Sequence, residues 1–97
     1  MTNGFVVLKD KAKYWECECA CKAHGLKLAE LDSSNFLNAS EAIRVNLGSF
    51  QKAWIKKYSS QSFGEQCLAI YTGAKSDASV LPMYCDVPIP VVCQQQQ

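Results

Sequence analysis

The residues from Cys21 to Ala29 read CKAHGLKLA, and they mark where one secondary-structure element ends and the next begins. Gly25 is well placed just past the end of a helix, because glycine readily adopts the conformation that terminates helices. Asp10 is a suitable N-cap for the same helix, which we therefore predict from about Lys11 to His24. The segment from Leu28 to Leu31 then forms a short extended link.

The pattern on both sides of this stretch predicts one more helix and several strands. The segment from Phe5 to Leu8 is short, apolar and rich in β-branched residues, which predicts a strand. A second helix is predicted from about Asn35 to Val45, with its N-cap among the Asp-Ser-Ser residues at 32–34 and its end at Gly48. Further strands are predicted at Ala53–Ile55, Cys67–Tyr71, Val80–Tyr84 and Val91–Cys93, with an irregular link around Pro88 and Pro90 before the last one.

This order of elements predicts an α+β fold, with two helices packed on small antiparallel sheets. The 97 residues indicate a single domain, which we place at residues 1–94, with 95–97 as a glutamine-rich tail or the start of a linker. Six cysteines in so short a chain indicate disulfides and an oxidising compartment. We therefore expect the protein outside the cell or at its surface. The start of the chain does not read as a signal peptide, so a secreted form has lost its signal.

Charge and hydropathy exclude two classes of partner. The net charge of +1 argues against nucleic acid, which normally requires a concentrated basic surface. No apolar run approaches the roughly 20 residues that would insert into a membrane as a helix. The sequence also lacks the serine-nucleophile, phosphate-loop and zinc-protease motifs, and it has a single histidine. We therefore predict that the protein is not an enzyme.

Four pieces of the chain together resemble the C-type lectin-like domain, over about residues 5–94. They are the end of the family's first helix at 21–29, the start of its WIGL strand at Ala53–Ile55, the strand of its second cysteine at Cys67–Tyr71, and its last two cysteines at Cys85 and Cys93. The resemblance implies that Cys21 pairs with Cys93 and that Cys67 pairs with Cys85. The sequence alone does not choose among the pairings that six cysteines allow.

The chain departs from this family where its sugar-binding members hold calcium. Only eleven residues lie between Ile55 and Cys67, where those members have a long loop with an EPN or QPD triplet. The sequence from Leu81 to Tyr84 stands where the family has its WND motif, and the nearby acids Glu65, Asp77 and Asp86 are scattered. Because calcium requires six to eight oxygen ligands, we predict no lectin-type calcium site. We also predict no other metal and no cofactor.

A cluster of cysteines in the first helix is the most distinctive feature of the chain. Cys17 lies one turn before Cys21 on the same face, which predicts a small buried residue. Cys19 points roughly 160° away and shares its face with Trp15, four residues earlier. We predict a self-association face at Trp15 and Cys19, which would give a homodimer, and an interchain disulfide through Cys19 is one form that it would take. The alternative is that Trp15 lies against a strand and that Cys19 is a free thiol.

Zinc is a weaker interpretation of the same segment. Cys17, Cys21 and His24 share one helix face, and zinc prefers cysteine and histidine ligands. A fourth ligand is not evident, however, and the resemblance places Cys21 in a disulfide. His24 is therefore expected to be partly buried instead.

The family resemblance implies a binding module that acts through its loops, here residues 56–65 and 73–84. The candidate ligand-binding residues are Lys56, Lys57, Tyr58, Phe63 and Tyr84, which offer hydrogen-bond donors and rigid aromatic area. The ligand is a glycan, bound without calcium, or a protein. Alternative functions are a structural or adhesion spacer of a larger surface protein, and a redox or metal sensor built on the three cysteines at 17, 19 and 21. Asn38 begins a glycosylation sequon.

Overall fold

The computed structural model describes residues 4–56, 66–74 and 77–95. It contains two helices and six strands within these ranges. Their order is β1 (Phe5–Ala12), α1 (Tyr14–Lys22), β2 (Leu26–Leu28), α2 (Phe36–Asn46), β3 (Lys52–Ile55), β4 (Gln66–Thr72), β5 (Ala78–Tyr84) and β6 (Ile89–Gln95). This confirms the predicted α+β class, with two helices on a small sheet.

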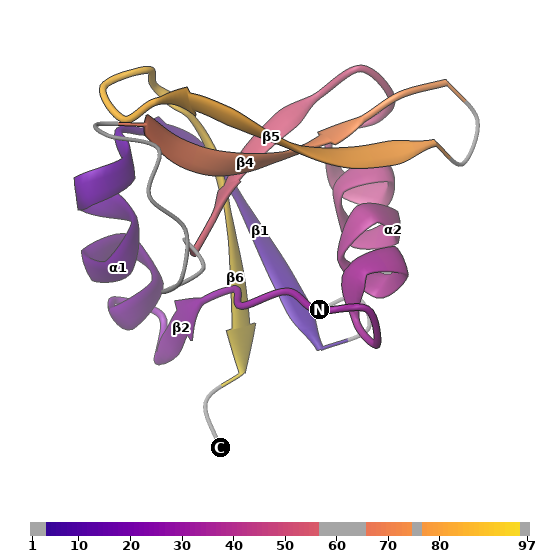
Figure 1. Cartoon of the computed structure of the whole chain (residues 1–97). Helices are drawn as coiled ribbons and strands as arrows, with labels where there is room; N and C mark the ends of the chain where they lie inside the picture. Colours follow the sequence, from indigo (N-terminus) through magenta and orange to yellow (C-terminus); the bar gives the residue numbers. More distant parts are fainter. Residues whose placement is uncertain (1–3, 57–65, 75–76, 96–97) are drawn as a thin grey trace.

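One sheet joins all six strands, in the order β1-β6-β3-β4-β5, with β2 also paired to β6. The pairs are antiparallel except β3 with β6, which is parallel around Trp54 and Val91. The sheet is thus mixed, whereas the sequence predicted antiparallel sheets. Because Phe5 pairs with Gln94, the first and last strands lie side by side and close the chain into a loop (Figure 1).

The two helices flank the sheet on different sides (Figure 1). The central strands bury residues toward both helices. In β3, Ala53 and Ile55 belong to a buried cluster under α2, while Trp54 between them belongs to a second cluster under α1. This alternation follows from the period of two along a strand. It explains why the predicted strand segments are almost continuously apolar. The indole N–H of the fully buried Trp54 donates to the carbonyl of Ala12 at 2.8 Å, which satisfies its polar atom.

The start of α1 differs from the prediction. Asp10 does not cap a helix, because β1 continues through it to Ala12. The register changes from Leu8 opposite Val91 to Ala12 opposite Ile89, so three residues of β1 face Pro90 alone. Proline has no N–H to donate to a ladder, and a bulge at this point accommodates it. The helix begins only at Tyr14, and the Glu16 carboxylate accepts a hydrogen bond from the Lys13 N–H at 2.8 Å.

Two other boundaries also differ. The last strand begins at Ile89 rather than Val91, so Pro90 lies inside β6 and not in an irregular link. The second helix has Asn35 as its N-cap, not one of residues 32–34. Asp32 instead accepts hydrogen bonds from the Ser34 N–H and hydroxyl and from the Asn35 N–H, which order the turn before the helix. These bonds, led by that of the Ser34 hydroxyl, lower the pKa of the Asp32 carboxyl.

Candidate functional site

The predicted ligand-binding residues do not form one cluster in the structure. Lys57, Tyr58 and Phe63 lie outside the described residues. Lys56 and Tyr84 are both exposed, but Lys56 lies near the C-terminal end of α1 and Tyr84 lies near its N-terminal end. The segment 73–84 is also not a loop, because β5 occupies 78–84.

The hairpin turn between β4 and β5 lies away from Tyr84. Antiparallel pairing sets Thr72 opposite Ala78 at one end of these strands, and Gln66 opposite Tyr84 at the other. The Arg44 side chain of α2 donates to the carbonyl of Gly73 at 3.0 Å, so the turn belongs to the α2 side of the molecule. The predicted loop segment 73–84 therefore runs along β5, from the α2 side of the molecule to the end at Tyr84.

The turn after β5 lies beside the first turn of α1 (Figure 1). The Tyr14 N–H donates to the Cys85 carbonyl at 2.9 Å, which brings the chain neighbours Trp15 and Tyr84 to the same end of α1. Both aromatic residues remain 60% or more exposed. The Lys13 ammonium lies 5.6 Å from the centre of the Trp15 ring. Trp15 is therefore largely exposed and does not belong to either buried cluster.

The side chains of α1 separate into a buried and an exposed face. Cys17 and Cys21 are fully buried against the sheet. The exposed side chains at helical spacings of three and four form what we call the outer face of α1, namely Trp15, Glu18, Cys19 and Lys22. The exposure of Cys19 and the burial of Cys17 agree with the sequence prediction.

A pocket of about 160 Å³ adjoins the C-terminal end of this outer face. We call it the charged pocket, and its lining residues are Glu18, Lys22, Lys27, Leu28, Glu30 and Lys56. Lys56 reaches it because its N–H donates to the Ala29 carbonyl at 2.9 Å, which ties the end of β3 to the segment after β2. The outer face of α1 therefore connects the Trp15–Tyr84 end to the charged pocket.

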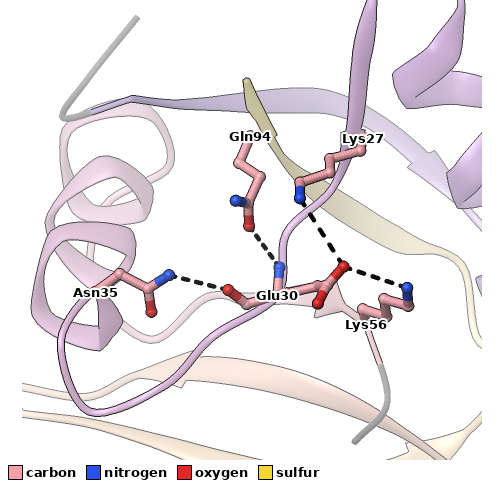
Figure 2. Close-up of polar contacts among 5 residues, drawn as sticks. All are labelled: Lys27, Glu30, Asn35, Lys56 and Gln94. Atoms are coloured by element: carbon pink, nitrogen blue, oxygen red, sulfur yellow. Dashed lines mark hydrogen bonds and ion pairs between the residues drawn. The ribbon is translucent and has the colours of Figure 1, made fainter. Parts of the chain in front are cut away.

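Glu30 organises the charged pocket (Figure 2). Its carboxylate lies 3.2 Å from the Lys56 ammonium and 4.0 Å from that of Lys27. Its N–H donates to the Gln94 side chain at 2.6 Å, and its carbonyl accepts from the Asn35 side chain at 2.9 Å. The backbone of Glu30 is thus held on both sides while its side chain points toward the two lysines.

The cysteines of α1 have different chemistry. Disulfides join Cys21 to Cys93 and Cys67 to Cys85, as the family resemblance implies. The Cys17 thiol donates to the Lys13 carbonyl at 3.4 Å, and its burial, with a smaller effect of the Glu16 charge, raises its pKa to about 12.

The zinc interpretation loses its ligands in this arrangement. Cys21 is in a disulfide, and His24 lies exposed after the end of α1, so the expectation of a partly buried histidine is wrong. Gly25 adopts a φ of +71°, which lets the chain turn between the end of α1 and the start of β2. His24 lies in this exposed turn. Within the described ranges, no three or more histidine, cysteine, aspartate or glutamate side chains are grouped so as to hold a metal ion.

Comparison with protein-family models and with curated proteins finds no match to this sequence. Solved structures do match. EMS16, an antagonist of the collagen receptor integrin α2β1, is 17% identical with a TM-score of 0.74, over 94% of this chain and 89% of its own. The C-type lectin-like domain of mouse CD72a is 17% identical with a TM-score of 0.74, over 94% of this chain and 82% of its own. The chain has a C-type lectin-like fold.

The snake venom toxin convulxin extends this likeness at 16% identity and a TM-score of 0.69, covering 96% of this chain and 90% of its own. At these identities the comparison establishes the C-type lectin-like fold and not the ligand. Neither described helix is long and apolar enough to cross a bilayer.

Sequence reasoning found Lys56 but missed the other lining residues of the charged pocket. Lys27 and Glu30 lie three residues apart, which indicates only a local contact at the surface. Their approach to Lys56 depends on the pairing of β2 with β6, and β2 was predicted only as part of a link. The resemblance to the C-type lectin-like domain predicted the fold, but it did not place the end of β3 beside the segment that follows β2.

Proposed function

We propose that this chain is a secreted or cell-surface binding module that recognises a glycan or protein ligand without lectin-type calcium coordination, and that it is not an enzyme. The observation that carries the proposal is the continuous outer face of α1, with exposed aromatic residues at one end and the charged pocket at the other. A helix of nine residues spans about 13 Å, which suits a short oligosaccharide or an extended peptide segment.

The chemistry of the two ends is complementary. Trp15 and Tyr84 offer flat apolar area at low entropic cost, and such residues often dominate binding energy. The charged pocket offers donors from lysine and acceptors from glutamate, which suit hydroxyl or charged groups. The solved structures with this fold include an integrin antagonist and a venom toxin, which supports a binding role and a location outside the cell.

A broad glycan array, run once with calcium and once with EDTA, tests this function. We expect binding that EDTA leaves unchanged, and Trp15→Ala or Tyr84→Ala should weaken it by at least about fivefold. Leu37→Ala is the matched control, because Leu37 is an exposed apolar residue on α2. Calcium-dependent binding, or equal loss in the control, would contradict the proposal. Absence of glycan binding directs the same variants to a screen of protein ligands.

The outer face of α1 also supports the homodimer through Trp15 and Cys19. Both residues are exposed on the same side of one helix, and a two-fold axis near Cys19 would bring equivalent thiols together. We expect a dimer on a non-reducing gel that Cys19→Ser abolishes, and a weaker noncovalent dimer in sedimentation that Trp15→Ala dissociates. A monomer with a freely alkylated Cys19 at all protein concentrations would exclude the dimer.

The alternative functions have less support. A sensor built on Cys17, Cys19 and Cys21 requires a reactive pair, but Cys21 is already bridged and the buried Cys17 thiol stays protonated. A role as a spacer does not explain why aromatic residues are exposed at one end of α1 and a charged pocket lies at the other. Asn38 is exposed on α2, away from the proposed ligand surface, and we propose that a glycan at this position leaves ligand binding intact.

A further inference from the structure

The charged pocket gathers more ammonium groups than its own carboxylates neutralise. Lys22 reaches it from the end of α1, Lys27 from β2 and Lys56 from beyond β3, while Glu18 and Glu30 supply the two negative charges. The lining thus keeps an excess of one positive charge. Three separate elements are required to bring these lysines together, so the cluster is a property of the fold and not of a charged run in the sequence.

The single carboxylate of Glu30 does not satisfy the lysines that it contacts. Its Oε1 atom faces both Lys56, at 3.2 Å, and Lys27, at 4.0 Å (Figure 2). Each ammonium carries three donors, so most of them remain directed to solvent. The side chains of Lys27 and Lys56 are 42% and 46% exposed, which leaves their ammonium groups within reach of a ligand. Among the described residues, the structure records no ion pair for Lys22.

The size of the pocket limits what it can take. Its 160 Å³ is below the roughly 300–1,000 Å³ that is typical of sites for larger ligands, so it suits one sugar ring or one small charged group. Leu28 is 3% exposed and supplies an apolar floor. The uncharged remainder of a longer ligand would continue along the outer face of α1 toward Trp15.

We propose that the charged pocket binds an acidic sugar unit, through the carboxylate or sulfate group of that unit. This inference rests on the proposed function, because it names the ligand class for the same surface. Lys22, Lys27 and Lys56 donate to the acidic group. Glu30 pairs with Lys27 and Lys56 in the free protein, so it competes with the ligand for them.

The test is a titration of the ¹⁵N-labelled full chain by NMR with methyl β-glucuronide, the neutral methyl β-glucoside and inorganic sulfate. We expect the glucuronide to shift the amide signals of Lys22, Lys27 and Lys56, and to bind at least about fivefold more tightly than the glucoside. Sulfate should shift the same signals. Raising the salt from about 0.01 M to about 0.15 M should weaken glucuronide binding, because the Debye length falls from about 30 Å to about 8 Å.

Variants separate ligand binding from damage to the structure. Lys22→Gln and Lys56→Gln should each weaken glucuronide binding about two- to fivefold, the range expected for exposed charge pairs, whereas Lys9→Gln on β1 should not. Glu30→Gln should strengthen binding, because it removes the competing carboxylate. A variant that merely disturbed the fold would weaken binding instead, so this opposite sign is the decisive readout.

Equal affinity for glucuronide and glucoside would overturn the inference, and so would signal shifts away from the pocket. Equally tight binding of an acetylated Asp-Glu dipeptide would overturn the assignment to a sugar. Failure of the proposed function has a different signature. If glycans bind on the array through Trp15 but glucuronide and glucoside bind the pocket equally, the binding module stands and only the acidic-sugar inference fails. If neither glycans nor proteins bind, the proposed function itself fails.

Discussion

At the scale of single residues, Cys17 and Cys19 have the same side chain in opposite environments. Cys17 is fully buried and hydrogen-bonded to a backbone carbonyl, while Cys19 is exposed on the outer face of α1. Burial disfavours the thiolate, which raises the pKa of Cys17 from 9.0 to about 12. The stability that this gives the folded state is present below pH 9 and is lost as the pH rises from 9 toward 12.

This difference predicts selective alkylation. At pH 8 a thiol of pKa 9 is about one tenth thiolate, whereas one of pKa 12 is about one ten-thousandth, so Cys17 should react about a thousandfold more slowly than in an unfolded chain. Iodoacetamide should add one group to the native monomer with both intrachain disulfides intact, at Cys19, as read by tandem mass spectrometry. Cys19→Ser should take up none until denaturant is added. Two groups added at similar rates to the native protein would contradict the burial of Cys17.

At the scale of elements, the sequence was sufficient where one strong pattern determined the result. The apolar runs predicted the cores of β3 and β4, and Gly25 correctly marked the region where α1 ends. The start of α1 was missed because the strand signal stops at Leu8, whereas the bulge opposite Pro90 carries β1 on to Ala12. No local propensity reports on such a bulge, since its cause lies about 80 residues away on β6.

The candidate site was predictable to a smaller extent than the elements. Exposure of Trp15 and Cys19 followed from helical periodicity alone. By contrast, the link from Tyr14 to Cys85 and the approach of Lys56 to Glu30 are contacts between distant segments. They joined two surfaces that the sequence presented separately, a self-association face and a ligand-binding loop. The proposed ligand surface and the proposed dimer face therefore share the outer face of α1, so the two proposals predict that ligand binding and dimer formation compete.

At the scale of the whole molecule, two disulfides and the pairing of β1 with β6 close the chain. The Cys21–Cys93 bridge spans 72 residues and ties α1 to the last strand, whereas the Cys67–Cys85 bridge spans 18 residues within the β4–β5 region. In the chain-entropy model the longer loop stabilises by about 4 kcal/mol and the shorter one by about 3 kcal/mol. Both bridges lie in the buried cluster under α1, so their local surroundings are similar.

We therefore expect the double variant Cys21→Ala with Cys93→Ala to lose about 1 kcal/mol more of its unfolding free energy than Cys67→Ala with Cys85→Ala, as measured by urea denaturation. Cys17→Ala is the matched control, because it removes a buried cysteine that closes no loop, and its loss should be only about 1 kcal/mol. A larger loss for the shorter bridge would mean that packing around Cys67, and not restriction of the unfolded chain, dominates.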